Sequence, residues 1–153
     1  MRFATGTVEK GESIMAHCSV KWVQGMQFVA SDDLGHAMVL DTSAEVGGLD
    51  QGFRPGQLLL VALGGCTGMD VISILEKKKQ KITSLEVHVN GENATEFPKR
   101  YTKMAVEYRL RGIGILNEAV QHAIQLSEDK YCLVRATLLP GVQIESSYMI
   151  ENE

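Results

Sequence analysis

The chain has 153 residues, of which 44% are apolar, and this suits one compact domain with a core. A net charge of −4 argues against nucleic acid as a partner, because phosphate binding needs a concentrated basic surface. No apolar run approaches the roughly 18 residues of a membrane span, and the first residues lack the apolar core of a signal peptide. Three cysteines in such a chain predict a cytoplasmic protein with reduced thiols and no membrane partner.

Weak periodicity at residues 1–15 indicates an N-terminal extension, and residues 16–153 are predicted to form a single domain. The first part of that domain contains short alternating segments separated by turn residues. They predict an antiparallel meander of three strands, at residues 16–23, 26–30 and 36–40. A loop follows whose length is typical of functional loops, at residues 41–54.

The pattern from Pro55 to about Lys81 is helical, and proline is well accepted in a first helical turn. Residues 58–63 are apolar on every face, so we expect this part of the helix to be buried all round. The remainder of the chain predicts further strands and helical segments, at residues 82–89 (strand), 101–110 (strand), 116–127 (helix), 128–132 (helical turn), 133–139 (strand) and 142–150 (strand). Strands with segregated helices indicate an α+β fold.

Gly64 and Gly65 interrupt the long helical pattern, and each costs about 1 kcal/mol relative to alanine inside a helix. One helix is therefore predicted to end at Gly64 and a second to begin near Cys66, with Thr67 and Asp70 as a capping box. A thiol at a helix N-terminus is favoured as thiolate. This interpretation makes Cys66 a reactive cysteine in an apolar pocket, and the alternative is a small core residue whose neighbouring glycines allow tight helix packing.

A second cysteine, Cys132, follows a polar helix boundary and could act as the partner of an oxidised Cys66. Spacing alone does not bring the two sulfur atoms together, since a disulfide needs Cα atoms within roughly 7 Å. The third, Cys18, is expected to be a half-buried strand residue. No metal site is predicted, because the chain has no Cys-x-x-Cys and because His17 and Cys18 are adjacent strand residues that point to opposite faces.

Two cysteine contexts resemble the motifs of the OsmC/Ohr family, the osmotically inducible and organic-hydroperoxide-resistance proteins. They are Arg54-Pro55-x-x-Leu58-Leu59-Leu60-x-Ala62-Leu63-Gly64-Gly65-Cys66-Thr67 and Ser127-Glu128-x-Lys130-Tyr131-Cys132. The Glu45-Val46-Gly47-Gly48 loop is similar to the YhfA-like branch in particular. The resemblance extends from about residue 16 to the end of the chain.

This resemblance implies an OsmC-like α+β fold, with antiparallel sheets, a long buried central helix and two chains interlocked as a homodimer. It also implies a thiol peroxidase without metal, flavin, haem or other cofactor. In that mechanism Cys66 attacks an organic hydroperoxide, its sulfenic acid condenses with Cys132, and a dithiol reductant of the lipoyl type reopens the disulfide.

The sequence departs from the peroxidases of the family at two charged positions. The family's arginine corresponds to Met26, and the glutamate that orients the arginine corresponds to Gly56. Arg54 and Glu45, in the adjoining loop, are candidates to replace this pair. The departure also supports a second hypothesis, a non-enzymatic protein that binds a small hydrophobic ligand in the same pocket.

Overall fold

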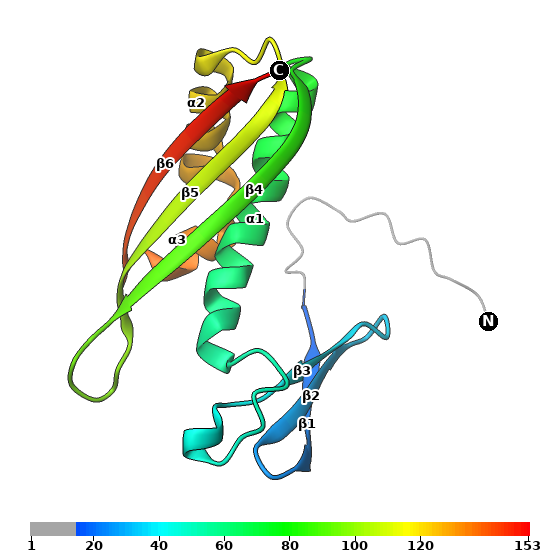
Figure 1. The fold of residues 1–153 in the computed structure, drawn as a ribbon, viewed down its shortest axis with the longest axis vertical. Coiled ribbons are helices and arrows are strands. Elements are labelled where there is room, and N and C mark those ends of the chain that lie inside the picture. The colour runs from blue at the N-terminus through cyan, green and yellow to red at the C-terminus, as the bar shows by residue number, and fades with distance from the viewer. Residues whose placement is uncertain (1–14) are drawn as a thin grey trace. The chain divides into compact units, whose positions relative to one another are not determined.

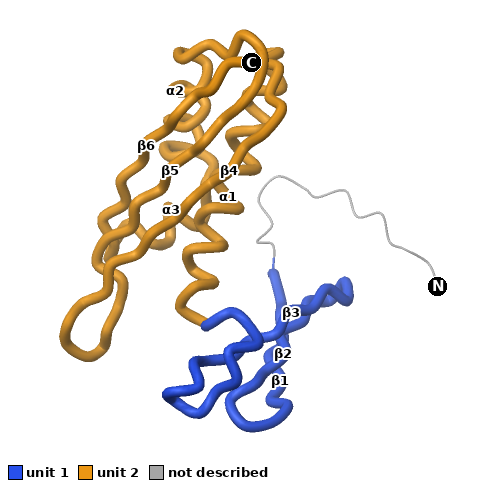
Figure 2. The backbone as a smooth tube through the Cα atoms, in the orientation of Figure 1, with its two compact units in different colours: residues 1–54 blue, residues 55–153 orange. Residues whose placement is uncertain are grey.

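The computed structural model describes residues 15–153, which form two compact units divided between residues 1–54 and 55–153 (Figure 2). The single domain predicted over residues 16–153 stays a prediction, since two compact units can belong to one domain. The predicted N-terminal extension lies outside the described residues except for Met15.

The first unit contains a three-stranded antiparallel sheet in the order β1-β2-β3, which confirms the predicted meander. Its elements are β1 (Cys18–Gln24), β2 (Gln27–Asp32), β3 (Ala37–Leu40) and the single 3₁₀ turn η1 (Ala44–Val46). Apolar residues are paired across the strands, with Phe28 opposite both Trp22 and Leu40. Cys18 is exposed on β1, so the expectation that it is half-buried was wrong. Every residue of β1 is exposed, so the alternating sequence pattern of this strand is not matched by one buried face.

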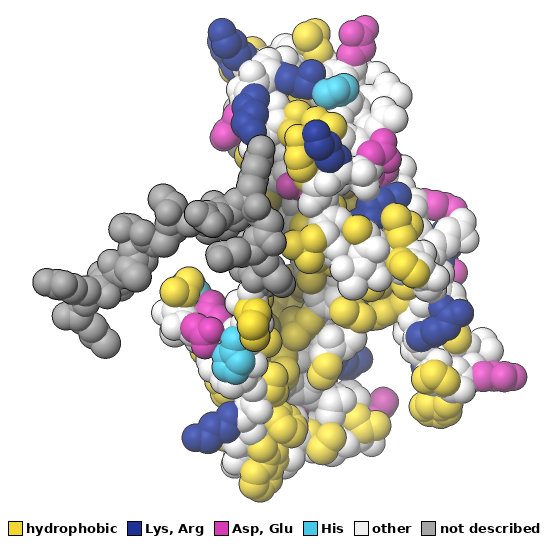
Figure 3. Space-filling model, turned by 180° about the vertical axis from the view of Figure 1, so that it is seen from behind, with side chains coloured by type: hydrophobic (Ala, Val, Ile, Leu, Met, Phe, Trp, Pro, Cys, Tyr) yellow, Lys and Arg dark blue, Asp and Glu magenta, His cyan; other side chains and the backbone are white. Residues whose placement is uncertain are grey.

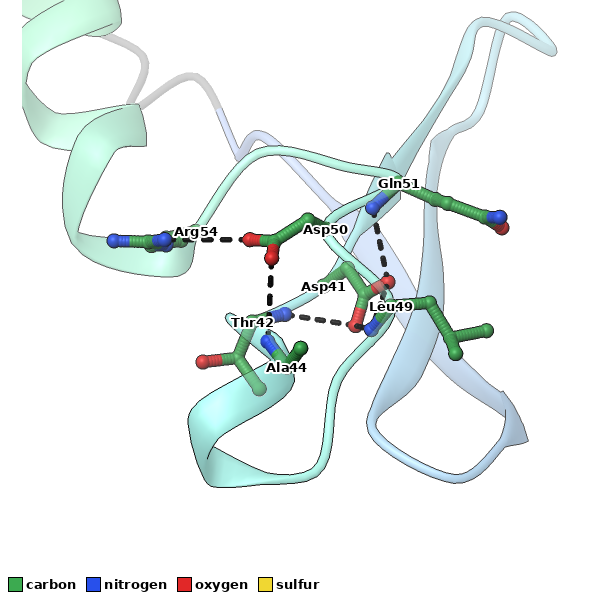
Figure 4. A network of polar contacts seen from close by, with 7 residues as sticks. All are labelled: Asp41, Thr42, Ala44, Leu49, Asp50, Gln51 and Arg54. Carbon is green, nitrogen blue, oxygen red and sulfur yellow. Dashed lines mark hydrogen bonds and ion pairs between the residues drawn. The ribbon is translucent and has the colours of Figure 1, made fainter.

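The loop after β3 is organised around one carboxylate, that of Asp41 (Figure 4). Asp41 is only 2% exposed. Asp41 accepts hydrogen bonds from the backbone N–H groups of Thr42 (2.8 Å), Leu49 (3.2 Å) and Gln51 (3.2 Å). Burial raises the pKa of Asp41, but these donors outweigh it, so the pKa is lowered from the ordinary value of an aspartate. A Cβ atom at Gly48 would lie 2.0 Å from the carbonyl oxygen of Thr42. The close backbone approach therefore requires glycine at this place in the loop.

Replacing Asp41 by asparagine is expected to loosen this loop, because an amide cannot accept all of these N–H bonds and presents donors of its own. We expect faster backbone amide exchange and faster proteolysis in residues 42–51 of Asp41→Asn than in the wild type. The wild-type loop should behave in the same way in acid, as pH falls through the lowered pKa of Asp41, because a lowered carboxyl pKa stabilises the fold only while the group is ionised. Protection of the loop that is equal in both proteins at neutral pH would contradict this account.

The second unit places its helices behind one sheet (Figure 1). Its elements are α1 (Pro55–Lys77), β4 (Lys81–Asn93), β5 (Tyr101–Ile113), α2 (Asn117–Leu126), the π-turn η2 (Ser127–Tyr131), α3 (Leu133–Leu138) and β6 (Gln143–Asn152). The strand order is β4-β5-β6, and α1 packs against β4, α2 and η2. Segregated strands and helices confirm the predicted α+β class.

The sheet of the second unit is mixed, which differs from the antiparallel sheets that were expected. β4 and β5 are antiparallel, whereas β6 pairs with β5 in parallel, with Tyr108 opposite Tyr148. The connection from β5 to β6 passes through α2, η2 and α3 and returns the chain to the end of the sheet where β5 begins. Two parallel strands need a crossover of this kind, because a short turn can join only antiparallel neighbours.

The core of this unit follows from two sequence periods. Along β5, alternate side chains are buried: Met104, Val106, Tyr108 and Leu110. Along α1, buried residues recur at helical spacing: Leu63, Thr67, Val71 and Leu75. These two sets belong to one cluster together with Val120, Ala123 and Ile124 of α2, apart from the polar Thr67.

α1 is continuous from Pro55 to Lys77, so the predicted break at Gly64 and the capping box were both wrong. The glycines serve packing instead. A Cβ atom at Gly64 would lie 3.0 Å from a methyl group of Val89, and one at Gly68 would lie 3.2 Å from a methyl group of Val87. Close approach between α1 and β4 therefore explains two of the glycines.

Gly65 differs from Gly64 because no neighbouring atom lies within 4 Å of the position that its Cβ would occupy. We expect Gly65→Ala to raise the free energy of unfolding by about 0.5–1 kcal/mol through helix propensity. Gly64→Val should lower it by about 1–3 kcal/mol through overpacking against Val89. Urea unfolding of the reduced proteins at one protein concentration measures both. Equal effects of the two substitutions would contradict the packing role of Gly64.

The segment at residues 133–139, predicted as a strand, is the helix α3. Val134 and Leu138 lie one turn apart and both pack against the core, and this spacing outweighs the β-propensity of the segment.

The expectation that residues 58–63 are buried on every face was also wrong, because Leu59 and Val61 are exposed.

Hydrophobic side chains are visible at the surface of the second unit (Figure 3). Exposed apolar residues of α1 include Leu59, Val61 and Met69, which are 44%, 49% and 76% exposed. By length and composition alone, α1 is the one helix in residues 15–153 that could cross a membrane. In the structure it is the core helix of the second unit, packed on β4 and α2.

Candidate active site

Three reactive side chains meet between α1 and the segment that follows η2. The sulfur atoms of Cys66 and Cys132 and a carboxylate oxygen of Asp70 all lie within 4.8 Å of one another. Both cysteines are free thiols. The structure therefore answers the question that sequence spacing left open, since it brings together two sulfur atoms that are 66 positions apart in the chain.

Local structure explains how each side chain reaches the site. Cys66 and Asp70 are one turn apart near the middle of the 23-residue helix α1, so they share a face. Cys132 follows the π-turn, and its backbone N–H donates to the carbonyl of Ser127 at 2.9 Å. Its sulfur accepts the backbone N–H of Arg135 at 3.4 Å, and this contact fixes the start of α3.

The two thiols have different environments. Cys66 is partly exposed, whereas Cys132 is 3% exposed. Burial raises the pKa of Cys132 to about 11, and the nearby Cys66 and Asp70 act in the same direction, against the N–H bond from Arg135. Cys132 is therefore a protonated thiol at neutral pH. Cys66 is not at a helix N-terminus, contrary to the prediction, so the helix dipole does not act on it as expected.

A chain of buried hydroxyl groups ends at the carboxylate of Asp70. Tyr108 and Thr67 are 2.5 Å apart, Thr67 and Ser127 are 3.0 Å apart, and Ser127 donates to Asp70 at 2.8 Å. Because Ser127 gives its one hydroxyl proton to Asp70, Ser127 must accept from Thr67, and Thr67 must accept from Tyr108. Burial raises the pKa of Tyr108 to about 12, so the phenol keeps the proton that it donates.

The two residues proposed to replace the family's charged pair lie in the first unit. Arg54 pairs with Asp50 at 3.3 Å, and Glu45 is part of η1. Their contribution to the thiol site stays a prediction. Met26 ends the turn between β1 and β2, and Gly56 lies in the first turn of α1. Neither position carries a charge, as the sequence indicates.

Asp70 and Ser127 are the site residues that sequence reasoning missed. Asp70 was interpreted as half of a capping box, and Ser127 only as part of a motif. The four-residue spacing of Cys66 and Asp70 could have identified Asp70, because residues four apart share a face of a continuous helix. The contact of Asp70 with Ser127 spans 57 positions of the chain, and no local pattern predicts it.

An apolar cavity of about 370 Å³ opens in the second unit, away from the cysteines. Its lining includes Gly56 and Leu59 of α1, with Tyr101, Leu138 and Val142. Gly56 and Leu59 lie about 10–15 Å along the helix from Cys66, at 1.5 Å per residue. This cavity is therefore not the apolar pocket that was expected around Cys66, because its lining does not include the cysteines.

Comparison with known proteins gives consistent matches. Residues 48–147 match the family model described as OsmC-like protein. Protein YhfA of Escherichia coli (strain K12) is 34% identical over 131 residues, which are 86% of this chain and 95% of YhfA. A crystal structure of a hypothetical protein from Aquifex aeolicus VF5 has a TM-score of 0.81 at 26% identity, covering 92% of this chain and 99% of that chain. An organic hydroperoxide resistance protein OsmC from Legionella pneumophila, described as a predicted redox protein, has a TM-score of 0.65 at 12% identity, covering 88% and 96%.

Proposed function

Because the chain belongs to the OsmC-like protein family, we propose that its adjacent thiols reduce organic hydroperoxides. Family membership and the fold shared with a hydroperoxide resistance protein support a redox or peroxide-related role. The single observation that carries the finer proposal is the approach of the Cys66 and Cys132 sulfurs to within 4.8 Å. Two thiols at this distance can exchange between dithiol and disulfide with only local movement, since a disulfide bond is about 2.05 Å long.

In the proposed reaction the Cys66 thiolate attacks the terminal oxygen of a hydroperoxide. An S–O bond forms, the O–O bond breaks, and the alkoxide leaves and takes up a proton to become the alcohol. The Cys132 thiol then condenses with the Cys66 sulfenic acid, which forms the disulfide and releases water. An external dithiol reduces this disulfide and is itself oxidised, so the balance is one hydroperoxide and one dithiol converted to alcohol, water and disulfide.

Burial supports the assignment of roles to the two cysteines. Cys66 is the more exposed thiol, and it is therefore the one that a substrate can reach. Cys132 is almost fully buried, so it is protected from direct attack but adjacent to the sulfenic acid. Asp70 is the carboxylate next to both sulfurs, and we infer that it accepts the Cys66 proton when the thiolate forms and passes that proton to the alkoxide that leaves.

Turnover of cumene hydroperoxide by the full-length protein tests this proposal. The assay uses dihydrolipoamide as the dithiol reductant and follows both peroxide loss and thiol consumption. We expect one dithiol to be oxidised for each hydroperoxide reduced, with hydrogen peroxide reduced more slowly. Peroxide loss no faster than in buffer with reductant, in protein whose thiols are titratable, would contradict the proposal.

We also propose that the protein is a homodimer, as the family resemblance implies. Val61 and Met69, which are exposed apolar residues of α1, lie towards the same side of the helix, and we expect a second copy to cover them. Light scattering during gel filtration should give twice the chain mass of 16.8 kDa. Val61→Lys should reduce that mass towards one chain if α1 is part of the interface, whereas substitution of the exposed Lys79 should not.

The chemistry further requires a compartment that returns the disulfide to two thiols. Free cysteines persist in a reducing cytoplasm, which supports the proposed cytoplasmic location. A lipoyl-type dithiol is the proposed reductant, because one reagent supplies both electrons and closes to a stable cyclic disulfide.

A second candidate function is the binding of a small hydrophobic ligand without catalysis. The observation in its favour is the apolar cavity lined by Leu59, Tyr101 and Leu138. Its position away from Cys66 separates the two hypotheses. Leu59→Trp should fill the cavity and reduce binding of an apolar fluorescent probe, and the same variant should leave the reactivity of Cys66 towards hydroperoxide unchanged.

A further inference from the structure

The site contains a set of donor atoms that can bind a metal ion, although the sequence predicted no metal site. Two sulfur atoms and one carboxylate oxygen, from Cys66, Cys132 and Asp70, lie within 4.8 Å of one another. We propose that the reduced protein binds one zinc ion through these three residues, with a fourth position open to water. This inference does not rest on peroxidase activity.

The donor types and their spacing fit zinc. Zn²⁺ binds thiolate sulfur at about 2.3 Å and carboxylate oxygen at about 2.0–2.2 Å in tetrahedral geometry. Donor atoms around such an ion are separated by about 3.5–3.8 Å, which follows from those bond lengths and the tetrahedral angle. The observed separations of up to 4.8 Å exceed this by about 1 Å. Rotation of side chains closes a difference of that size.

The placement of the donors also suits a metal. Cys66 and Asp70 are four residues apart on α1, and paired ligands on one helix face commonly have this spacing. Cys132 comes from a different segment, which lies beside the helix after the π-turn. Two ligands from one helix and one from a neighbouring segment leave the remaining side of the ion free for a water molecule or another ligand.

The hydroxyl chain orients the carboxylate. Ser127 donates to Asp70 at 2.8 Å and is completely buried. Thr67 holds Ser127 in turn, and Tyr108 holds Thr67. Carboxylates that bind metals are themselves held by hydrogen bonds of this kind, which fix the ligand before the ion arrives.

The charge of the site favours a dication. Within residues 55–153, Asp70 accepts a hydrogen bond from Ser127 and forms no ion pair with lysine or arginine. Zinc binds both cysteines as thiolates, so the donor set with the Asp70 carboxylate carries three negative charges around two positive ones. A disulfide between Cys66 and Cys132 removes both sulfur ligands, so zinc binding and the oxidised state exclude each other.

Titration of the full-length reduced protein with Co²⁺, a coloured substitute for zinc, tests the proposal. We expect one Co²⁺ per chain, with visible absorption typical of tetrahedral coordination and a thiolate-to-cobalt charge-transfer band. Added Zn²⁺ should displace the cobalt and remove both absorptions. Folded, reduced protein that gives no such absorption would overturn the proposal.

Substitutions identify the ligands. Asp70→Asn should weaken binding by at least about 10-fold, and Ser127→Ala by about 10–100-fold through loss of carboxylate orientation. Cys66→Ser and Cys132→Ser should each remove the charge-transfer band of the two-thiolate site. Cys18→Ser is the matched control, because Cys18 is an exposed thiol on β1, and its binding should equal that of the wild type. Loss of the signal in Cys18→Ser, or unchanged affinity in Asp70→Asn, would overturn the assignment.

Discussion

Replacing Cys66 by serine is expected to abolish hydroperoxide turnover, with a loss of at least about 1,000-fold relative to the wild type. The reason is that the sulfur atom forms the S–O bond, and a serine hydroxyl is far less nucleophilic at neutral pH. Serine is close to cysteine in size, and Cys66 is only partly buried, so the fold should be retained. Initial rates of cumene hydroperoxide loss, measured with dihydrolipoamide as reductant, give the comparison.

The other cysteines provide matched controls for this result. Cys132→Ser should reduce one equivalent of hydroperoxide and then slow down, because the sulfenic acid of Cys66 has no resolving thiol and proceeds to over-oxidation. Cys18→Ser should have the wild-type rate. Turnover that persists in Cys66→Ser but is lost in Cys18→Ser would move the reactive thiol to β1 and contradict the proposed site.

Replacing Thr67 by valine is expected to lower the free energy of unfolding by about 1–3 kcal/mol. Valine has nearly the same shape but leaves the Tyr108 hydroxyl without an acceptor and Ser127 without its donor. Tyr108 is 1% exposed, so water cannot replace the lost partner. Urea unfolding of the reduced proteins at a fixed concentration measures the change.

Tyr108→Phe is the informative control for this substitution. It removes the donor itself and leaves Thr67 bound to Ser127, so its cost should be only about 1 kcal/mol. The order of the hydroxyl chain predicts this asymmetry between the two substitutions. A larger loss for Tyr108→Phe than for Thr67→Val would show that the chain is not directed towards Asp70 as derived.

The sequence was sufficient to predict the α+β class, the three-stranded meander and the helical pattern that begins at Pro55. Alternation along β5 and helical spacing along α2 carry this information directly, because each has one buried face. Family resemblance supplied what periodicity could not, including the relation between Cys66 and Cys132. The approach of their sulfurs depends on the π-turn, whose geometry no local pattern specifies.

The interpretation of the glycines failed for a physical reason. Gly64 and Gly65 lower helix propensity, and on that ground the helix was expected to end. Packing of Gly64 and Gly68 against the valines of β4 requires small residues, and this tertiary contact outweighs the local cost. Because the helix is continuous, Asp70 does not cap a helix and its carboxylate lies at the thiol site. The missed residue and the wrong helix boundary therefore have one cause.

The measurement that tests the central claim most directly is the mass of the reduced protein after one equivalent of cumene hydroperoxide. The account predicts a decrease of about 2 Da per chain, and peptide mapping should locate the disulfide between Cys66 and Cys132. A disulfide that includes Cys18, or a gain in mass from oxygen added to Cys66 without a disulfide, would contradict it.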